Sequence, residues 1–71
     1  MEMLILKTNI NSKIDFKRVR HTLNNSYKIN ECTVDLGDRD KVLRVVGDKL
    51  DMKDIINRVK NLGYYCEDLT Y

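Results

Sequence analysis

The sequence predicts an α+β fold in which two amphipathic helices cover one face of a four-stranded antiparallel sheet. Along the chain, the period of the apolar residues changes from two to 3.6 and back, in the order strand, helix, strand, strand, helix, strand. A capping sequence precedes each helical stretch. The 71 residues are 42% hydrophobic and 34% charged, which suits one folded domain with one thin core. We therefore expect a single domain over residues 1–71.

The first half of the chain predicts one strand and one helix. Residues 3–8 alternate along a strand and place Leu4, Leu6 and Thr8 on the same face. A helix is expected after Ser12, because Ser12 and Asp15 form the capping-box pattern in which the hydroxyl accepts from a free backbone amide. The apolar stripe of this helix consists of Phe16, Val19 and Leu23.

The second half predicts a hairpin, a helix and a final strand. Residues 31–36 and 42–46 alternate on either side of a polar turn, so they form an antiparallel hairpin with Leu43 and Val45 facing inward. Asp51 to Asp54 is a second capping sequence, and Gly63 is expected to end the helix that follows. Residues 64–69 form the last strand. This order is the ferredoxin-like βαββαβ arrangement, in which the first and third strands are central.

The charge balance argues against a nucleic-acid partner. The net charge of +2, from 13 basic and 11 acidic residues, is far below the excess of a protein that binds mainly phosphates. Sheets that bind RNA stack bases on aromatic residues of their central strands, and these predicted strands have none. The tyrosines lie instead in a loop, a corner, an edge strand and the terminus: Tyr27, Tyr64, Tyr65 and Tyr71.

The sequence indicates a cytoplasmic protein with no membrane partner. The apolar run near the N-terminus covers only residues 3–6, whereas a signal peptide needs about 7–15 apolar residues. No run approaches the about 20 residues of a transmembrane helix. Cys32 and Cys66 are too few for a disulfide framework, and we expect them far apart, each buried in the core on an edge strand.

Four stretches resemble the heavy-metal-associated (copper-chaperone-like) domain family in order and spacing. They correspond to the approach to that family's metal loop, its second strand, its third strand, and its second helix with a Gly-Tyr corner: residues 6–11, 34–36, 40–45 and 55–64. The resemblance covers nearly the whole chain and implies the same ferredoxin-like fold. Metal-carrying members have a CxxC motif before the first helix, and the corresponding positions here are Ser12 and Asp15.

The resemblance therefore implies a degenerate metal site. Cu(I) prefers thiolates, and a helix N-terminus lowers a thiol pKa enough to supply them near neutral pH. Ser12 cannot replace a thiolate, Asp15 offers only one hard oxygen donor, and helix capping explains both residues. We expect no metal cofactor. The alternative is copper or zinc on non-standard ligands such as Asp15, His21 or a cysteine exposed by assembly.

No catalytic constellation is apparent in the sequence. His21 lies about 120° around the predicted helix from Asp15 and has no nucleophile or carboxylate beside it. The acidic residues of the hairpin miss the calcium-loop pattern and suit a turn: Asp35, Asp38 and Asp40. The arginine-bearing phosphate loop of the acylphosphatases, enzymes of this general fold, has no counterpart. We expect that the protein is not an enzyme.

The first predicted helix carries a basic stripe that is a candidate docking surface. Its members are Lys13, Lys17, His21 and the neighbouring Arg20. In the resembled family a basic face in this region docks acidic partner domains, and we expect Tyr64 to join it here. The alternative is an ordinary solvated helix face.

The open face of the sheet is a second candidate surface, for a homodimer. There Met3 and Ile5 are expected to neighbour Val42 and Val46 and to form an apolar patch that two copies bury face to face. The predicted function is a small non-catalytic interaction domain with a degenerate metal site that docks a protein partner, for which an acidic protein is the candidate. The alternative is a heavy-metal-binding or transport protein with non-standard ligands.

Overall fold

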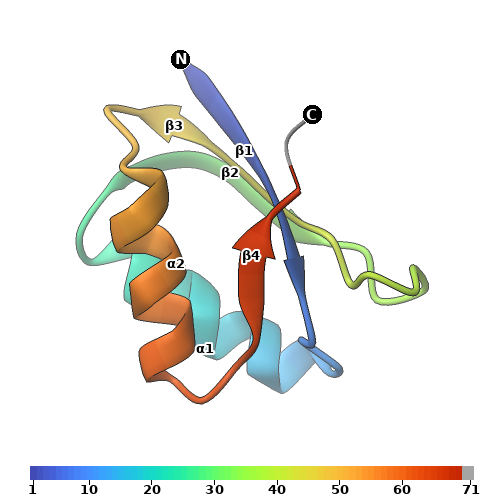
Figure 1. Cartoon of the computed structure of the whole chain (residues 1–71). Helices are drawn as coiled ribbons and strands as arrows, with labels where there is room; N and C mark the ends of the chain where they lie inside the picture. Colours follow the sequence, from blue (N-terminus) through green and yellow to red (C-terminus); the bar gives the residue numbers. More distant parts are fainter. Residues whose placement is uncertain (70–71) are drawn as a thin grey trace.

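The structure, a computed structural model, describes residues 1–69 and has two layers, a four-stranded sheet and two helices on one of its faces (Figure 1). The elements are β1 (Glu2–Thr8), α1 (Lys13–Asn24), β2 (Lys28–Val34), β3 (Leu43–Asp48), α2 (Met52–Asn61) and β4 (Cys66–Asp68). The strand order is β2-β3-β1-β4, and every neighbouring pair is antiparallel. The predicted ferredoxin-like fold is confirmed. Tyr71 lies outside the described residues.

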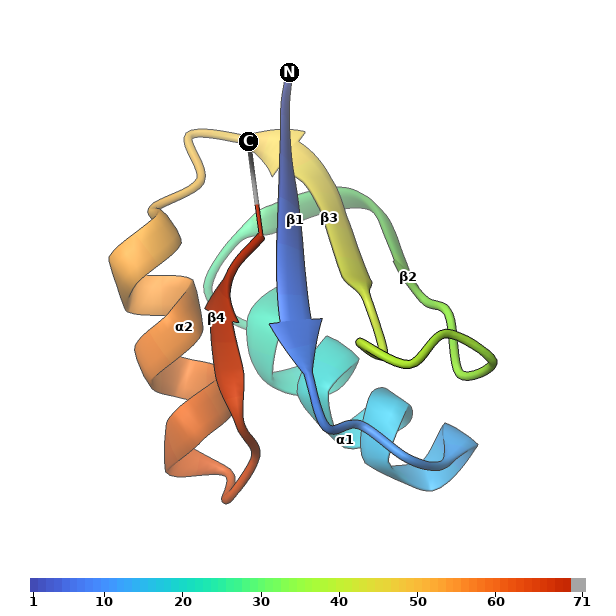
Figure 2. The ribbon, with the colours of Figure 1, turned by 45° about the vertical axis from the view of Figure 1, so that its right-hand side comes forward.

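Figure 2 shows β1 between β3 and β4, with α1 behind the sheet and α2 at the left beside β4. Helix α1 contacts β2, and α2 contacts β4, so each helix covers one side of the sheet. Neither helix in residues 1–69 is long and apolar enough to span a membrane.

Both predicted capping sequences begin helices. The Ser12 hydroxyl accepts from the Asp15 backbone N–H at 3.2 Å, and the Asp51 carboxylate accepts from the Asp54 N–H at 3.2 Å. These bonds satisfy backbone donors that the first turn of a helix leaves free. After α2, Gly63 has a φ of +99°, a conformation that glycine adopts without steric cost. The helix boundaries therefore follow from local chemistry that the sequence displays.

Strands β2 and β4 differ in length from the prediction. Strand β2 spans Lys28–Val34 instead of the predicted residues 31–36, because the register shifts between Ile29 and Glu31 and the alternation from which the strand was predicted begins only after this shift. Strand β4 begins only at Cys66. The Tyr64 N–H donates to the Val59 carbonyl, and the Tyr65 N–H donates to the Asn9 side chain, so neither N–H is available to pair with β1.

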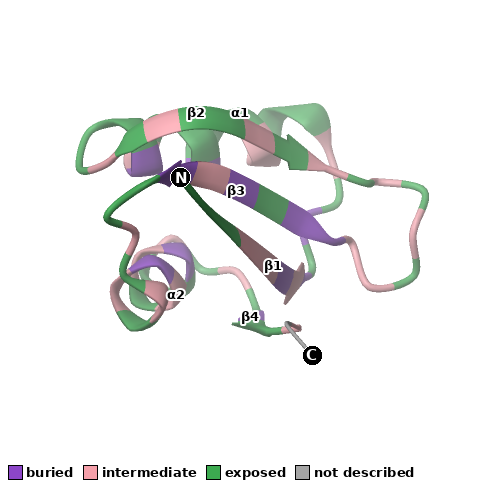
Figure 3. Ribbon diagram, turned by 90° about the horizontal axis from the view of Figure 1, so that it is seen from above, coloured by how far each residue is buried: buried purple, intermediate pink, exposed green. Residues whose placement is uncertain are grey.

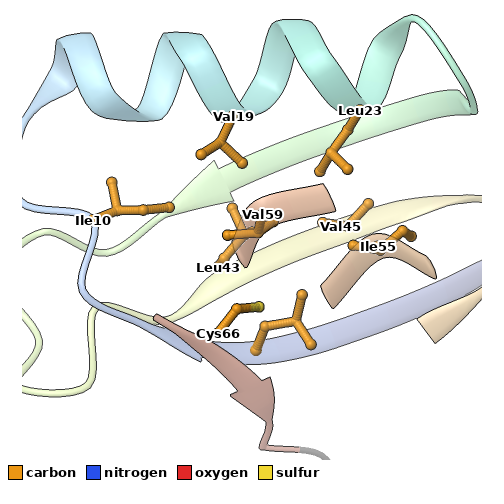
Figure 4. Packing of buried hydrophobic residues seen from close by; sticks show 9 residues of the cluster. Ile10, Val19, Leu23, Leu43, Val45, Ile55, Val59 and Cys66 are labelled. Atoms are coloured by element: carbon orange, nitrogen blue, oxygen red, sulfur yellow. The ribbon is translucent and has the colours of Figure 1, made fainter. Parts of the chain in front are cut away.

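Nine apolar side chains form the core between the sheet and the helices, each at most 1% exposed (Figure 4). They are Leu6, Ile10, Val19, Leu23, Leu43, Val45, Ile55, Val59 and Cys66. Leu43 and Val45 face inward, as predicted. The buried Thr8 hydroxyl donates to the Lys41 carbonyl at 2.6 Å and accepts from the Ile10 N–H at 3.2 Å. These bonds fix the loop that leads from β1 to α1.

Replacing Ile55 with alanine tests this core. Ile55 is 0% exposed, so Ile55→Ala should lower the free energy of unfolding by about 2–5 kcal/mol, through lost burial and the cavity that remains. The matched control is Ile14→Ala on the other helix, where the side chain is 71% exposed and the change should stay within about 0.5 kcal/mol. Urea denaturation followed by circular dichroism measures both. Equal losses would contradict this assignment of the core.

Candidate functional site

The loop at the start of α1 is held by hydrogen bonds among the residues that the sequence singled out. Ser12 caps the helix, and the Tyr64 hydroxyl donates to Asp15 Oδ1 at 2.7 Å. The Tyr64 bond is the main cause that lowers the pKa of Asp15, and the bond with Ser12 and the charge of Arg18 act in the same direction. The same bond raises the pKa of Tyr64. Asp15 therefore both supports the helix start and binds the segment after α2.

The donor types in this loop do not suit a soft metal ion. Ser12 and Asp15 supply only oxygen atoms, and the Ser12 hydroxyl and Asp15 Oδ1 already accept hydrogen bonds from the protein. Over residues 1–69, no three histidine, cysteine, aspartate or glutamate side chains are grouped so that they could hold a metal ion.

A groove of about 360 Å³ lies between α1 and β2, and we call it the α1–β2 groove. One side of the helix and the neighbouring strand supply its lining residues, which are Lys13, Phe16, Lys17, Arg20, Cys32, Thr33, Val34 and Leu36. The four helical residues share one face, since they are spaced three or four positions apart. Four of the lining side chains are apolar, and three are cations. The groove is therefore apolar with a strongly basic rim.

The three cations of the groove have no anionic partner within the described part of the chain. The ion pairs there are those of the N-terminus with Asp48, Lys7 with Asp40, and Arg58 with Asp54. The positive charge of the rim is therefore uncompensated.

The structure brings together three of the five residues predicted to dock a partner. Lys13, Lys17 and Arg20 line the α1–β2 groove, whereas His21 is exposed on α1 and does not line it. Tyr64 is bound to Asp15 at the start of α1 and does not line the groove either.

The apolar lining of the groove was missed as a site because its residues were assigned to the core. Phe16, Val34 and Leu36 are in fact only half-buried. Their inward-facing pattern was read correctly, but β2 is an outer strand and α1 covers it from one side only. The signal available in the sequence was the apolar alternation of a predicted edge strand next to the basic face of the first helix. Together they indicate an apolar groove with cations beside it.

The two cysteines lie on opposite edge strands, as predicted, but only one is fully in the core. Cys66 is 1% exposed, whereas Cys32 is half-buried and lines the groove. Burial raises the pKa of both thiols to about 11, and for Cys32 it outweighs the opposing effect of the Arg20 charge. Both are therefore neutral thiols near neutral pH, and the prediction that Cys32 is a core residue needs this correction.

The predicted apolar patch on the open face is smaller than expected. Met3 is 54% exposed and pairs with the half-buried Val46, but Ile5 pairs with Arg44, which places a charge in the patch. Val42 is only 8% exposed, so its assignment to the patch was wrong. It precedes β3 at the base of the hairpin, where its carbonyl accepts from the Asp35 N–H at 3.0 Å. The homodimer stays a prediction.

No protein-family model and no curated protein matches the chain. Solved structures match it over almost its whole length. The copper-binding domain of HMA7, a P-type ATPase, has a TM-score of 0.81 at 19% identity and covers 99% of this chain and 96% of its own. The yeast copper transporter domain Ccc2A has a TM-score of 0.84 at 17% identity, with 99% and 97% covered. The CopZ metallochaperone has 0.79 at 19%, with 93% and 100% covered.

The fold is therefore that of heavy-metal-associated domains, as the sequence resemblance implied. The comparison contradicts the expectation that no metal cofactor is involved, because two of the matching structures are a copper-binding domain and a copper transporter domain. Copper, which the sequence offered only as the alternative, is the metal to which the comparison points. At these identities the similarity establishes the fold and leaves the activity of this chain to be tested.

Replacing Tyr64 with phenylalanine tests the bond at the start of α1. Because that bond lowers the pKa of Asp15, Tyr64→Phe should raise it toward the ordinary value of 3.8. A carboxyl with a lowered pKa stabilises the folded state above pH 3.8, and this stabilisation is lost as the pH falls through the folded-state pKa. The variant should therefore lose less stability on acidification. Carboxyl NMR titration measures the pKa, with Tyr65→Phe as the matched control. An unchanged Asp15 titration would contradict the bond.

Proposed function

We propose that this chain is a non-catalytic docking domain with the heavy-metal-associated fold, and that it binds an acidic protein partner at the α1–β2 groove. The observation that carries the proposal is the set of three unpaired cations around an apolar groove, Lys13, Lys17 and Arg20. Complementary charge guides the approach of a partner, and burial of apolar surface holds it in place. His21 and Tyr64, which the sequence added to this surface, are not needed for the groove itself.

We propose a structural role for the former metal loop. Ser12 begins α1, and Asp15 ties α1 to the segment after α2 through Tyr64, so both side chains have a function without a metal. This hydrogen-bonded arrangement supports the view that the loop at Ser12 and Asp15 is degenerate with respect to the CxxC motif.

Copper handling is the second candidate function, and the copper-binding structures with the same fold favour it. Cys32 is the thiol in residues 1–69 that has partial access to solvent, and it lies in the groove at which we propose docking. Cys32 is therefore the side chain to test first, although metal binding would have to displace the proton that burial holds on this thiol. A Cu(I) competition titration of the unchanged chain against Cys32→Ser, with a coloured chelator, tests this candidate. Tight binding that depends on Cys32 would favour it over docking alone.

Restoring two cysteines tests the alignment of the loop with the metal motif. The double variant Ser12→Cys with Asp15→Cys should bind Cu(I) more tightly than the unchanged chain, because the start of α1 lowers thiol pKa values and the two thiols are spaced as CxxC. The matched control is Thr22→Cys with Asn25→Cys, which has the same spacing at the other end of α1, where the helix dipole opposes thiolates. Equal affinities in the two folded variants would place the alignment in doubt.

Charge reversal on α1 tests docking. Lys17→Glu with Arg20→Glu should weaken binding of the partner about tenfold at low salt, with a smaller loss at high salt. The partner is captured from an extract of the source cells, identified by mass spectrometry, purified and titrated by calorimetry. Lys49→Glu with Lys53→Glu makes the same change in net charge at exposed positions away from the groove and should preserve the affinity. If the two pairs had the same effect, specific docking at the groove would be excluded.

A further inference from the structure

Strand β2 leaves one edge of the sheet open beside the α1–β2 groove. It is the outermost strand in the order β2-β3-β1-β4, and no other strand of residues 1–69 pairs with its outer side. Figure 3 shows β2 along this edge with α1 behind it. The row of backbone donors and acceptors on such an edge can pair with another extended chain.

The register identifies the backbone groups that point outward. The Asp35 N–H donates inward to the Val42 carbonyl, and the register is regular from Glu31 to Val34. In an antiparallel pair, successive residues direct their backbone groups to alternate sides. The N–H and C=O groups of Cys32 and Val34 therefore point away from β3, along the open edge.

The side chains of these same two residues line the groove. A chain that paired with the edge would therefore run along the groove and pass the rim cations Lys13, Lys17 and Arg20. Every second side chain of an extended segment points to one face of the sheet, so an apolar side chain with acidic neighbours two positions away fits this lining.

We infer that the partner docks by adding an acidic extended segment, with an apolar residue at its centre, as a fifth strand along β2. This inference rests on the proposed docking function and specifies the form of the partner. The seven residues of β2 set the length of the segment that the edge can pair.

A second copy of this chain fits the same edge less well. Two-fold pairing of β2 with β2 would bring the two α1 helices to the same side of the joined sheet, with the rim cations of one copy near those of the other. Like charges at that distance repel, whereas an acidic segment neutralises them.

A synthetic peptide provides the direct test. The probe has seven residues in the order threonine, glutamate, threonine, valine, threonine, glutamate, threonine, so that one face carries two carboxylates around one apolar side chain. NMR titration of the isotope-labelled chain should show slowed amide exchange at Cys32 and Val34, while Glu31 and Thr33, which already face β3, stay unchanged. Lys17→Glu with Arg20→Glu should weaken binding about tenfold.

Two N-methylated versions of the probe, called twins here because they differ only in which amides are methylated, distinguish binding by strand pairing from binding by charge attraction alone. One twin carries the methyl groups on the odd-numbered amides and the other on the even-numbered amides. Only one of these sets can face β2, so one twin should bind about tenfold or more weakly and the other should keep its affinity. A third peptide with lysine in place of glutamate should not bind.

The outcomes distinguish this inference from the proposed function. Equal binding of both twins, with unchanged exchange at Cys32 and Val34, would overturn strand addition and leave charge-driven docking in place. Equal binding of the lysine peptide would overturn both. Absence of any binding at millimolar probe would overturn strand addition. The docking function would then still be tested by titrating the captured partner against the charge-reversal variants. Dimerisation of the chain alone in sedimentation, with those two amides protected, would assign the edge to a second copy instead.

Discussion

Coverage of one sheet face by only two helices is the constraint from which the main features of this domain follow. Helix α1 packs against β2 and α2 against β4, and the core between them is closed by Leu43 and Val45 on the central strand β3. Strand β2 therefore has α1 on one face, and no strand of residues 1–69 pairs with its outer edge. Its inward-facing side chains remain half-buried. The α1–β2 groove is thus a direct consequence of the way this small sheet is covered.

The fold was predictable because the signals that define it are local. The caps at Ser12 and Asp51 and the alternation that turns Leu43 and Val45 inward are visible in short stretches of sequence. The prediction was wrong where strand pairing sets the bounds of a strand, and where loop geometry sets the burial of a residue. The irregularity after Ile29 is a property of the β2–β3 register, and the burial of Val42 depends on the fold of the hairpin base. Neither can be inferred from periodicity.

The candidate site was harder to predict because its parts come from two elements. The cations of α1 were visible as a stripe, but residue spacing alone could not show that Lys13, Lys17 and Arg20 face β2 while His21 points elsewhere. Cys32 illustrates the same limit. An alternating pattern assigns it to the inner face of its strand, and only the position of the strand at the edge leaves it half-buried beside Arg20.

The start of α1 is held by hydrogen bonds between side chains and backbone of the chain itself. Two of the matching structures are a copper-binding domain and a copper transporter domain, and in this chain the Ser12 hydroxyl caps α1 by accepting from the Asp15 N–H. The Tyr64 hydroxyl on Asp15 adds a link between α1 and the end of α2, so the loop keeps its shape through neutral and charged hydrogen bonds. Both bonds therefore hold the start of α1 within the loop and against the segment after α2. The basic rim and the open strand edge lie side by side because α1 and β2 line the same groove, and the proposed acidic segment would contact both.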